Sequence, residues 1–114
     1  MFLGRWGAAR ITRRIMGDQE TTPEAVEATI LIMTNFKTRL GTVPIFTDAE
    51  LQRLVMPVFL MVGAKDVLRD AKKIVTRMKA LLPQLKAVVV PNGGHALLNI
   101  TAPILSFLET IDQS

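Results

Sequence analysis

The chain has no cysteine, only one histidine and few aromatic residues among its 114 positions. Without cysteine, a disulfide framework, a thiolate nucleophile and a zinc–thiolate site are all excluded. Aromatic residues make up 5% of the chain. Surfaces that bind nucleic acid typically interleave basic with aromatic side chains, so this scarcity argues against a nucleic-acid partner.

The sequence also lacks the apolar segments that direct a chain to or across a membrane. No run approaches the roughly 18 apolar residues that a membrane-spanning helix needs. The start, Met1–Trp6, lacks the continuous apolar core of a signal peptide, and its arginine-rich, acid-free character comes without the serines of a transit peptide. We therefore expect a cytoplasmic protein with no membrane partner. The net charge of +4 reflects a solvated basic helix face whose arginines are Arg5, Arg10, Arg13 and Arg14.

Apolar residues, in contrast, are abundant. They make up 49% of the chain, and the mean hydropathy is +0.32. A chain this short forms at most one small domain, whose high surface-to-volume ratio leaves little interior for so much apolar sequence. The composition therefore predicts a buried interface, either with a partner or with the rest of a larger fold.

The first third of the sequence predicts two helices. Residues 5–16 have amphipathic spacing, with Trp6, Ala9, Ile11 and Ile15 on one side, and Gly17 is a plausible end. A second helix begins after Thr22, with Pro23 in the first turn, and runs to about residue 37. Its segment 28–33 is apolar nearly all round, which predicts that it is covered on more than one side.

The remainder alternates strands with helices. Thr47 and Glu50 match a capping box before a short helical turn. The apolar runs 58–62 and 86–90 are typical of parallel strands covered on both faces, and helices are expected over 70–82 and 103–111. The predicted class is α/β, with a right-handed βαβα unit and one parallel strand pair behind leading helices. Two parallel strands do not form a self-sufficient core, so they need neighbours.

Two residues with proton-handling side chains follow the two predicted strands. Asp66 comes after Gly63 at the end of the first strand, and His95 comes after Gly93-Gly94 at the end of the second. The carboxyl ends of parallel strands share one rim of the sheet, where functional groups collect. There an aspartate that accepts from one ring nitrogen leaves the other nitrogen as a general base. The flanking glycines permit tight, positive-φ turns that lift a side chain clear of the strand.

The spacing alone leaves ordinary alternatives open. A single histidine in a glycine-rich turn is more often a surface residue, and Gly-x-x-Asp is a common strand-to-helix loop. Asp70 is a rival acid, although capping of the following helix explains it better.

A family resemblance favours the catalytic interpretation. Residues 46–51, 56–66, 83–95 and 104–108 resemble, in that order, the C-terminal part of α/β-hydrolase-fold enzymes of the serine esterase and lipase type. The resemblance covers about 36–111, and the family's chain order is Ser, then Asp or Glu, then His. It implies that Asp66 is the triad acid and His95 the triad base. It also implies a partial α/β-hydrolase fold, with a helical cap-like segment at 1–45 and the C-terminal βαβα portion of the core at 46–114.

The chain departs from the family at the nucleophile. It contains no Gly-x-Ser-x-Gly, and its two serines, Ser106 and Ser114, lack the flanking residues of a nucleophile elbow. The resemblance implies hydrolysis of ester or related acyl bonds in a complete enzyme, with a small-molecule ester-like substrate and no metal or organic cofactor. We expect this chain alone to be inactive.

Three explanations would account for the missing nucleophile. We favour a piece of a full hydrolase over a small protein that completes its sheet with another chain or itself. A separately encoded half that assembles with an N-terminal half is the third. The alternative of a different class is a non-catalytic α/β module that self-associates through its exposed strand edge and apolar faces. The partner is therefore expected to be a second copy or a missing N-terminal half.

Overall fold

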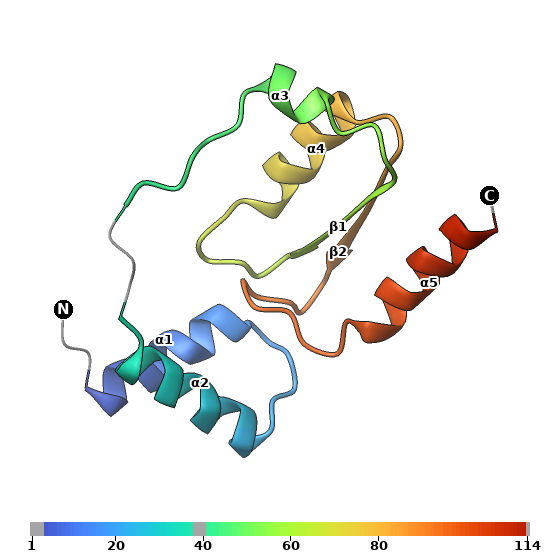
Figure 1. The fold of residues 1–114 in the computed structure, drawn as a ribbon. Coiled ribbons are helices and arrows are strands. Elements are labelled where there is room, and N and C mark those ends of the chain that lie inside the picture. The colour runs from blue at the N-terminus through green and yellow to red at the C-terminus, as the bar shows by residue number, and fades with distance from the viewer. Residues whose placement is uncertain (1–3, 38–40, 114) are drawn as a thin grey trace.

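The computed structural model describes residues 4–37 and 41–113. Two helices lead, and a strand–helix–strand–helix unit follows a short helix (Figure 1). The elements in chain order are α1 (Arg5–Met16), α2 (Pro23–Asn35), α3 (Asp48–Gln52), β1 (Val58–Gly63), α4 (Ala71–Leu81), β2 (Leu85–Val90) and α5 (Thr101–Asp112).

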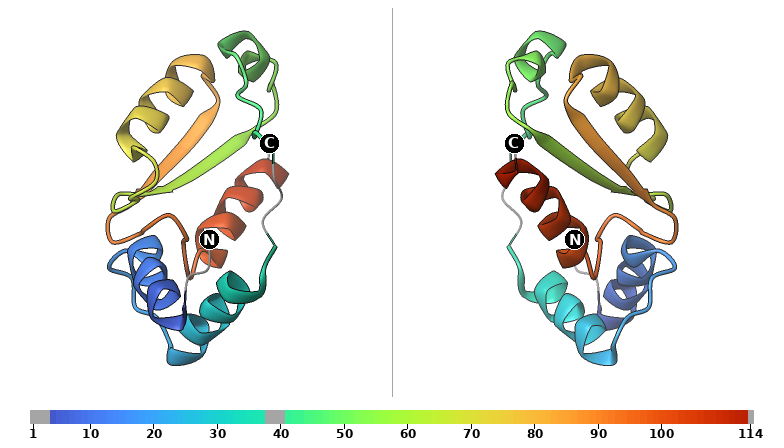
Figure 2. Two further views of the ribbon diagram at one scale, coloured as in Figure 1. Left: turned by 90° about the vertical axis from the view of Figure 1, so that its left-hand side faces the viewer. Right: turned by 90° about the vertical axis from the view of Figure 1, so that its right-hand side faces the viewer.

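The two strands form a parallel pair, as predicted. Their register runs from Val58 opposite Leu85 to Gly63 opposite Val90, so both strands end at the same rim. Helix α4 makes the crossover and lies on one face of the pair, while α5 lies on the other face (Figure 2). The ring of Phe107 in α5 stacks on Phe59 in β1, with ring centroids 5.0 Å apart. Both faces of the pair therefore carry a helix, which is the α/β arrangement that the sequence predicted.

The predicted helix starts are confirmed by their caps. The Thr22 hydroxyl accepts a hydrogen bond from the backbone N–H of Ala25, and Asp70 accepts one from Lys73. Thr47 and Glu50 form the expected reciprocal capping box before α3. Each cap satisfies a backbone N–H that the first helical turn cannot pair internally.

The buried face of α1 differs from the predicted one. Trp6, expected on the apolar side, is 75% exposed, whereas Ala8, Thr12 and Met16 are buried. The contact with α2 lies on the side of Thr12, whereas the exposed Trp6 ring carries the guanidinium of Arg10, 5.4 Å from its centroid. The Thr12 hydroxyl lies 3.4 Å from the sulfur of Met33 in α2.

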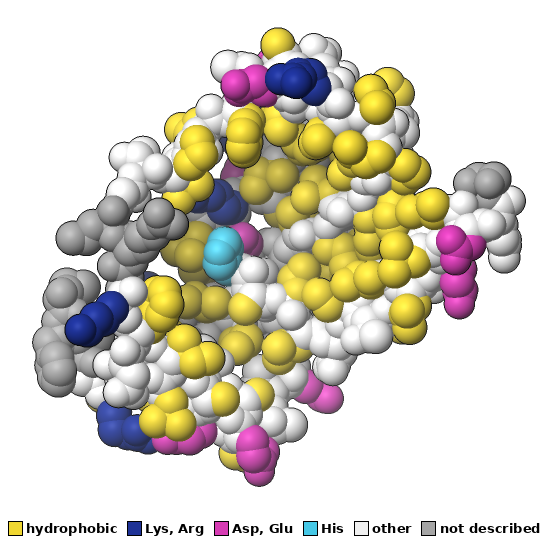
Figure 3. Space-filling view, in the orientation of Figure 1, with side chains coloured by type: hydrophobic (Ala, Val, Ile, Leu, Met, Phe, Trp, Pro, Cys, Tyr) yellow, Lys and Arg dark blue, Asp and Glu magenta, His cyan; other side chains and the backbone are white. Residues whose placement is uncertain are grey.

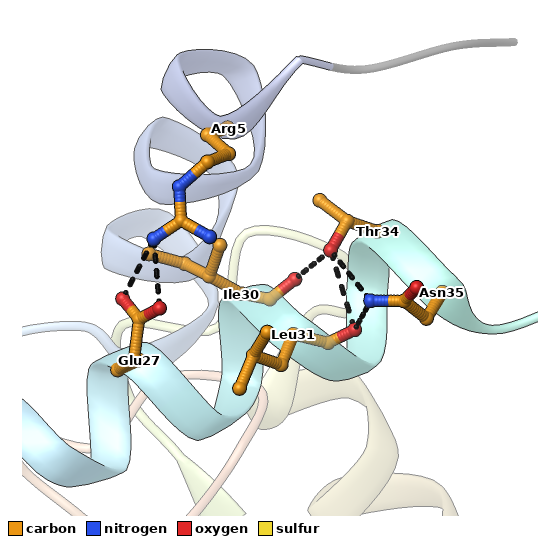
Figure 4. A network of polar contacts seen from close by, with 6 residues as sticks. All are labelled: Arg5, Glu27, Ile30, Leu31, Thr34 and Asn35. Atoms are coloured by element: carbon orange, nitrogen blue, oxygen red, sulfur yellow. Dashed lines mark hydrogen bonds and ion pairs between the residues drawn. The ribbon is translucent and has the colours of Figure 1, made fainter.

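Polar contacts link α1 to α2 and close the end of α2 (Figure 4). Arg5 and Glu27 form an ion pair at 2.7 Å, but their side chains are 64% and 49% exposed, so the pair adds little stability. The side chains of Thr34 and Asn35 donate hydrogen bonds to carbonyls of the last turn of α2. Thr34 donates to the carbonyl oxygen of Ile30, and Asn35 donates to that of Leu31 (Figure 4).

The molecule is open for its size. Its radius of gyration is 16.6 Å, against about 13 Å for a compact domain of this length. Its accessible surface is 9011 Å², against roughly 6200 Å² for a compact monomer of this mass. Apolar side chains gather on the face shown in Figure 3. In the described part of the chain, no helix is long and apolar enough to cross a membrane.

The apolar segment 28–33 contributes to this exposure. Helix α1 covers one side of α2 and buries Ile30, but Leu31 and Ile32 are 48% and 63% exposed. The sequence predicted that this segment is covered on more than one side. Within the described residues only one side of α2 is covered. In β2, Val89 is likewise 44% exposed.

Candidate functional site

Asp66 lies just beyond β1 in a turn that fixes its carboxylate. One oxygen, Oδ1, accepts hydrogen bonds from the backbone N–H groups of Leu68 at 2.7 Å and Arg69 at 3.0 Å. The side chain is only 11% exposed. With Oδ1 held by two backbone donors, the second oxygen, Oδ2, points in one defined direction.

That second oxygen faces His95. The distance from Nδ1 of His95 to Oδ2 of Asp66 is 3.0 Å, so the structure brings together the two residues singled out from the sequence. An ionised carboxylate can only accept, and Nδ1 must therefore carry the proton. The second ring nitrogen, Nε2, is then a free acceptor. The ring is 46% exposed, and the cyan histidine in Figure 3 lies beside a hollow with acidic atoms next to it.

The hydrogen bonds around Asp66 favour the ionised form of its carboxyl group. Burial raises the pKa of its carboxyl, but hydrogen bonds from His95 and from the backbone of Leu68 and Arg69 outweigh that effect. The pKa therefore lies below the ordinary value of 3.8. Asp66 is ionised at neutral pH and holds the proton of His95 on Nδ1.

Close backbone approach at the strand ends brings the two loops into contact. The N–H of Ala64 donates to the carbonyl of Val90 at 2.9 Å, and that of Lys65 donates to Gly93 at 2.8 Å. A Cβ atom on Gly63 would overlap the carbonyl oxygens of Gly93 and Gly94. Glycine is required at 63 because only a residue without Cβ admits the neighbouring backbone this closely.

The positive φ angles permitted at these glycines are not found. Among the described residues, the glycine with positive φ is Gly17, at 68°, where α1 ends. Gly94 resembles Gly63 in its crowding, because a Cβ there would strike the backbone of Ile15, Met16 and Gly17. The positive φ that these glycines permit is therefore not used, and the lack of space for a Cβ atom is what requires glycine at 63 and 94.

The other candidate residues take no part in this site. Asp70 accepts from the N–H of Lys73 at 3.0 Å and caps α4, as its alternative reading predicted. Ser106 is an exposed residue of α5, and in the described part of the chain no hydrogen bond joins it to His95. Ser114 lies outside the described residues.

An open groove of about 730 Å³ runs from Asp66 along the start of α4 and includes Arg69, Lys72 and Val89. His95 is not among the residues that line it. Across residues 4–37 and 41–113, no group of three or more carboxylate or imidazole side chains could hold a metal ion.

One contributor to the site had no signal in the sequence. Gln19 lies between α1 and α2. Its side chain donates a hydrogen bond to the carbonyl of Ala96, which directly follows His95 and lies 77 positions away in the chain. No motif or periodicity marks it, because its partners are backbone atoms that only the fold brings near.

Comparison with known proteins gives a consistent picture, although no family model matches the chain. Carboxylesterase YbfK of Bacillus subtilis (strain 168) is 36% identical over 70 residues, which cover 56% of this chain and 23% of that protein. The uncharacterized carboxylesterase nap of the same organism is 34% identical over 53 residues, covering 46% of this chain and 18% of the relative. The crystal structure of carboxylesterase CesB (YbfK) superimposes with a TM-score of 0.66 and 26% identity, over 96% of this chain and 41% of that one.

The fold is therefore a partial α/β-hydrolase fold, as the sequence predicted. Within that class the chain is related to carboxylesterases and resembles a C-terminal portion of such an enzyme. The matched segments cover only about a fifth of the length of the curated relatives, and the superposition covers 41% of the carboxylesterase CesB chain.

Proposed function

We propose that Asp66 and His95 are the acid and the base of a Ser-Asp-His triad that hydrolyses ester or related acyl bonds. The observation that carries the proposal is the 3.0 Å contact between Nδ1 of His95 and Oδ2 of Asp66. This contact leaves Nε2 as the only ring atom able to accept a proton. The serine and the oxyanion donors come from polypeptide outside these 114 residues, because no nucleophile elbow occurs within them.

The residues present account for the proton movements of such a reaction. Nε2 of His95 accepts the serine proton as the serine oxygen bonds to the acyl carbon. Asp66, ionised and fixed through Oδ1, stabilises the imidazolium that forms. Nε2 then gives the proton to the departing alkoxide. In the second half it takes a proton from the water that attacks the acyl-enzyme and returns it to the serine oxygen as the carboxylic acid leaves.

The same assignment predicts that the chain is inactive by itself. A base without a nucleophile or oxyanion donors retains little of the triad's rate enhancement. We expect no serine-dependent esterase activity from the purified chain. Labelling of Ser106 or Ser114 by a fluorophosphonate would contradict this.

A chimera tests the proposal directly. The part of carboxylesterase YbfK that matches this chain is replaced by the chain itself, and hydrolysis of a p-nitrophenyl ester is measured. We expect Asp66→Asn to lower kcat about 10⁴-fold and His95→Ala to lower it at least as far. Asp70→Asn is the matched control, since asparagine also caps a helix, and its rate should stay within twofold.

An active chimera that keeps its rate with His95→Ala overturns the proposal. If the chimera does not fold, NMR of the 114-residue chain decides the question. The only histidine gives a single imidazole spin system. Its Nδ1–H signal must be protected from exchange and must lose that protection with Asp66→Asn. An exchange rate unaffected by Asp66→Asn refutes the dyad.

The second candidate is a non-catalytic module that self-associates, and the exposed apolar surface favours it. The accessible area exceeds that of a compact monomer by roughly 2800 Å², more than the total of about 1600 Å² that a standard interface buries. A dimer by light scattering supports this function, whereas a stable monodisperse monomer refutes it.

We further propose that residues 1–45 act as a cap-like segment, that a small ester is the substrate, and that the protein is cytoplasmic.

A further inference from the structure

We propose that Gln19 is a positioning residue for His95, an inference that rests on the proposed function of the dyad. Its side chain makes three hydrogen bonds to backbone groups. The amide Nε2 donates to the carbonyls of Met16 at 2.6 Å and Ala96 at 2.7 Å, and Oε1 accepts from the N–H of Leu98 at 2.8 Å. Gln19 thus ties the end of α1 to the residues that directly follow His95.

The polar pattern requires an amide at this position. Two carbonyl oxygens need a group with two N–H donors, and the N–H of Leu98 needs an acceptor. Only the side-chain amide of asparagine or glutamine offers both. The same pattern fixes which end of the amide is nitrogen, because a flipped Gln19 would set its oxygen against two carbonyls. A glutamate would retain the acceptor and lose both donors.

The backbone around Gln19 forms the rest of the clamp. The last carbonyls of a helix lack partners within the helix. Here those of Ile15 and Met16 accept from the N–H groups of Ala96 at 3.1 Å and Gly94 at 3.2 Å. The two donors flank His95 on either side. The segment carrying His95 is therefore bound to α1, and Gln19 extends that attachment beyond Ala96.

The two ends of His95 are thus held by different parts of the chain. Asp66 orients the ring through Nδ1, whereas α1 and Gln19 fix the backbone from which the ring projects. If the loop moves, the ring can keep its bond to Asp66 only by changing its own torsions. The clamp should therefore determine how long the contact between Nδ1 and Oδ2 persists.

The test uses the 114-residue chain and compares two glutamines. Gln84 also donates to two carbonyls, those of Leu54 at 2.5 Å and Met56 at 3.0 Å, away from the site. Gln19→Met and Gln84→Met each remove such a bridge while keeping side-chain length. Hydrogen exchange of His95 Nδ1–H is measured by NMR, with urea unfolding as the measure of overall stability.

We expect Gln19→Met to speed exchange of the Nδ1 proton at least about tenfold, since all three hydrogen bonds of the amide are lost. Gln84→Met should lower stability to a similar extent and leave that exchange within twofold. Equal exchange in wild type and Gln19→Met overturns the inference, as does an equal effect of Gln84→Met.

If Gln19→Met does not fold, Gln19→Glu takes its place. It must speed exchange of the Nδ1 proton while the amide of Leu98 stays protected, and loss of protection at Leu98 alone refutes the inference. The chimera reports on the proposed function separately. Persistence of activity after His95→Ala rejects the catalytic role without touching the exchange result for Gln19.

Discussion

Replacing Gly63 with alanine should separate Asp66 from His95. The added Cβ would overlap the carbonyl oxygens of Gly93 and Gly94, where ordinary contact begins at 3.4 Å. The loop must therefore retreat by about 1 Å, because the obstructing atoms are backbone and not flexible side chains. Such a shift lengthens the 3.0 Å contact between Nδ1 and Oδ2 to about 4 Å, beyond hydrogen-bond range.

The energetic cost follows from the bonds that break. The retreat removes the charge-assisted bond between His95 and Asp66, worth about 1.5–3 kcal/mol, and weakens the backbone bond from Lys65 to Gly93, worth about 1 kcal/mol. We therefore expect Gly63→Ala to lower the free energy of unfolding by about 2–4 kcal/mol.

Urea unfolding and the NMR signal of the single histidine check both expectations. Gly41→Ala is the matched control, because nothing lies within 4 Å of a Cβ at that position. Its stability should stay within about 0.5 kcal/mol of wild type. The reasoning is refuted if Gly63→Ala unfolds like the control, or if its Nδ1 proton remains as protected as in wild type.

Three further predictions concern the carboxylate and the packing around it. The pKa of Asp66 is lowered on folding, so its stabilisation is complete well above pH 3.8 and is lost as the pH falls below that value. The urea midpoints of wild type and Asp66→Asn should therefore differ at pH 7 and converge towards pH 2, and a constant gap would contradict this. Leu82 is 2% exposed. Leu82→Ala should therefore lower the free energy of unfolding by about 2–4 kcal/mol in the same assay. A loss under about 1 kcal/mol would mean that the surrounding side chains collapse into the space that leucine leaves. Phe107→Leu removes the ring stacked on Phe59 and should cost about 1 kcal/mol, with an unchanged midpoint showing that α5 does not depend on this contact.

The sequence was sufficient to predict the elements and the pairing of Asp66 with His95. Short apolar runs bounded by turn residues define parallel strands, and the carboxyl ends of such strands share one rim. Two polar residues placed just beyond them must then lie close together. Topology thus predicts their proximity, the family resemblance favoured their pairing, and the structure places Nδ1 and Oδ2 3.0 Å apart.

Other features depend on distances that no local pattern encodes. Gln19 reaches Ala96 across 77 positions of sequence, and its signal is indistinguishable from that of a surface glutamine. Trp6 fits an apolar stripe by spacing, yet α2 packs against the side of α1 that carries Thr12 and leaves the indole exposed. In both cases the outcome depends on the neighbouring element, which periodicity within one helix does not specify.

Polar and apolar groups are satisfied to different extents in this chain. Both oxygens of Asp66 and the Nδ1 proton of His95 have partners, and among the described residues no buried side-chain nitrogen or oxygen lacks one. Several apolar side chains of α2 and α5, in contrast, remain exposed, among them Ile32 and Leu105. Hydrogen bonds specify local geometry, whereas apolar burial supplies most of the stability. The contact between Asp66 and His95 is therefore formed within these residues although many apolar side chains stay exposed. Under the proposed function, a polypeptide that covered the apolar faces would chiefly add stability and the serine.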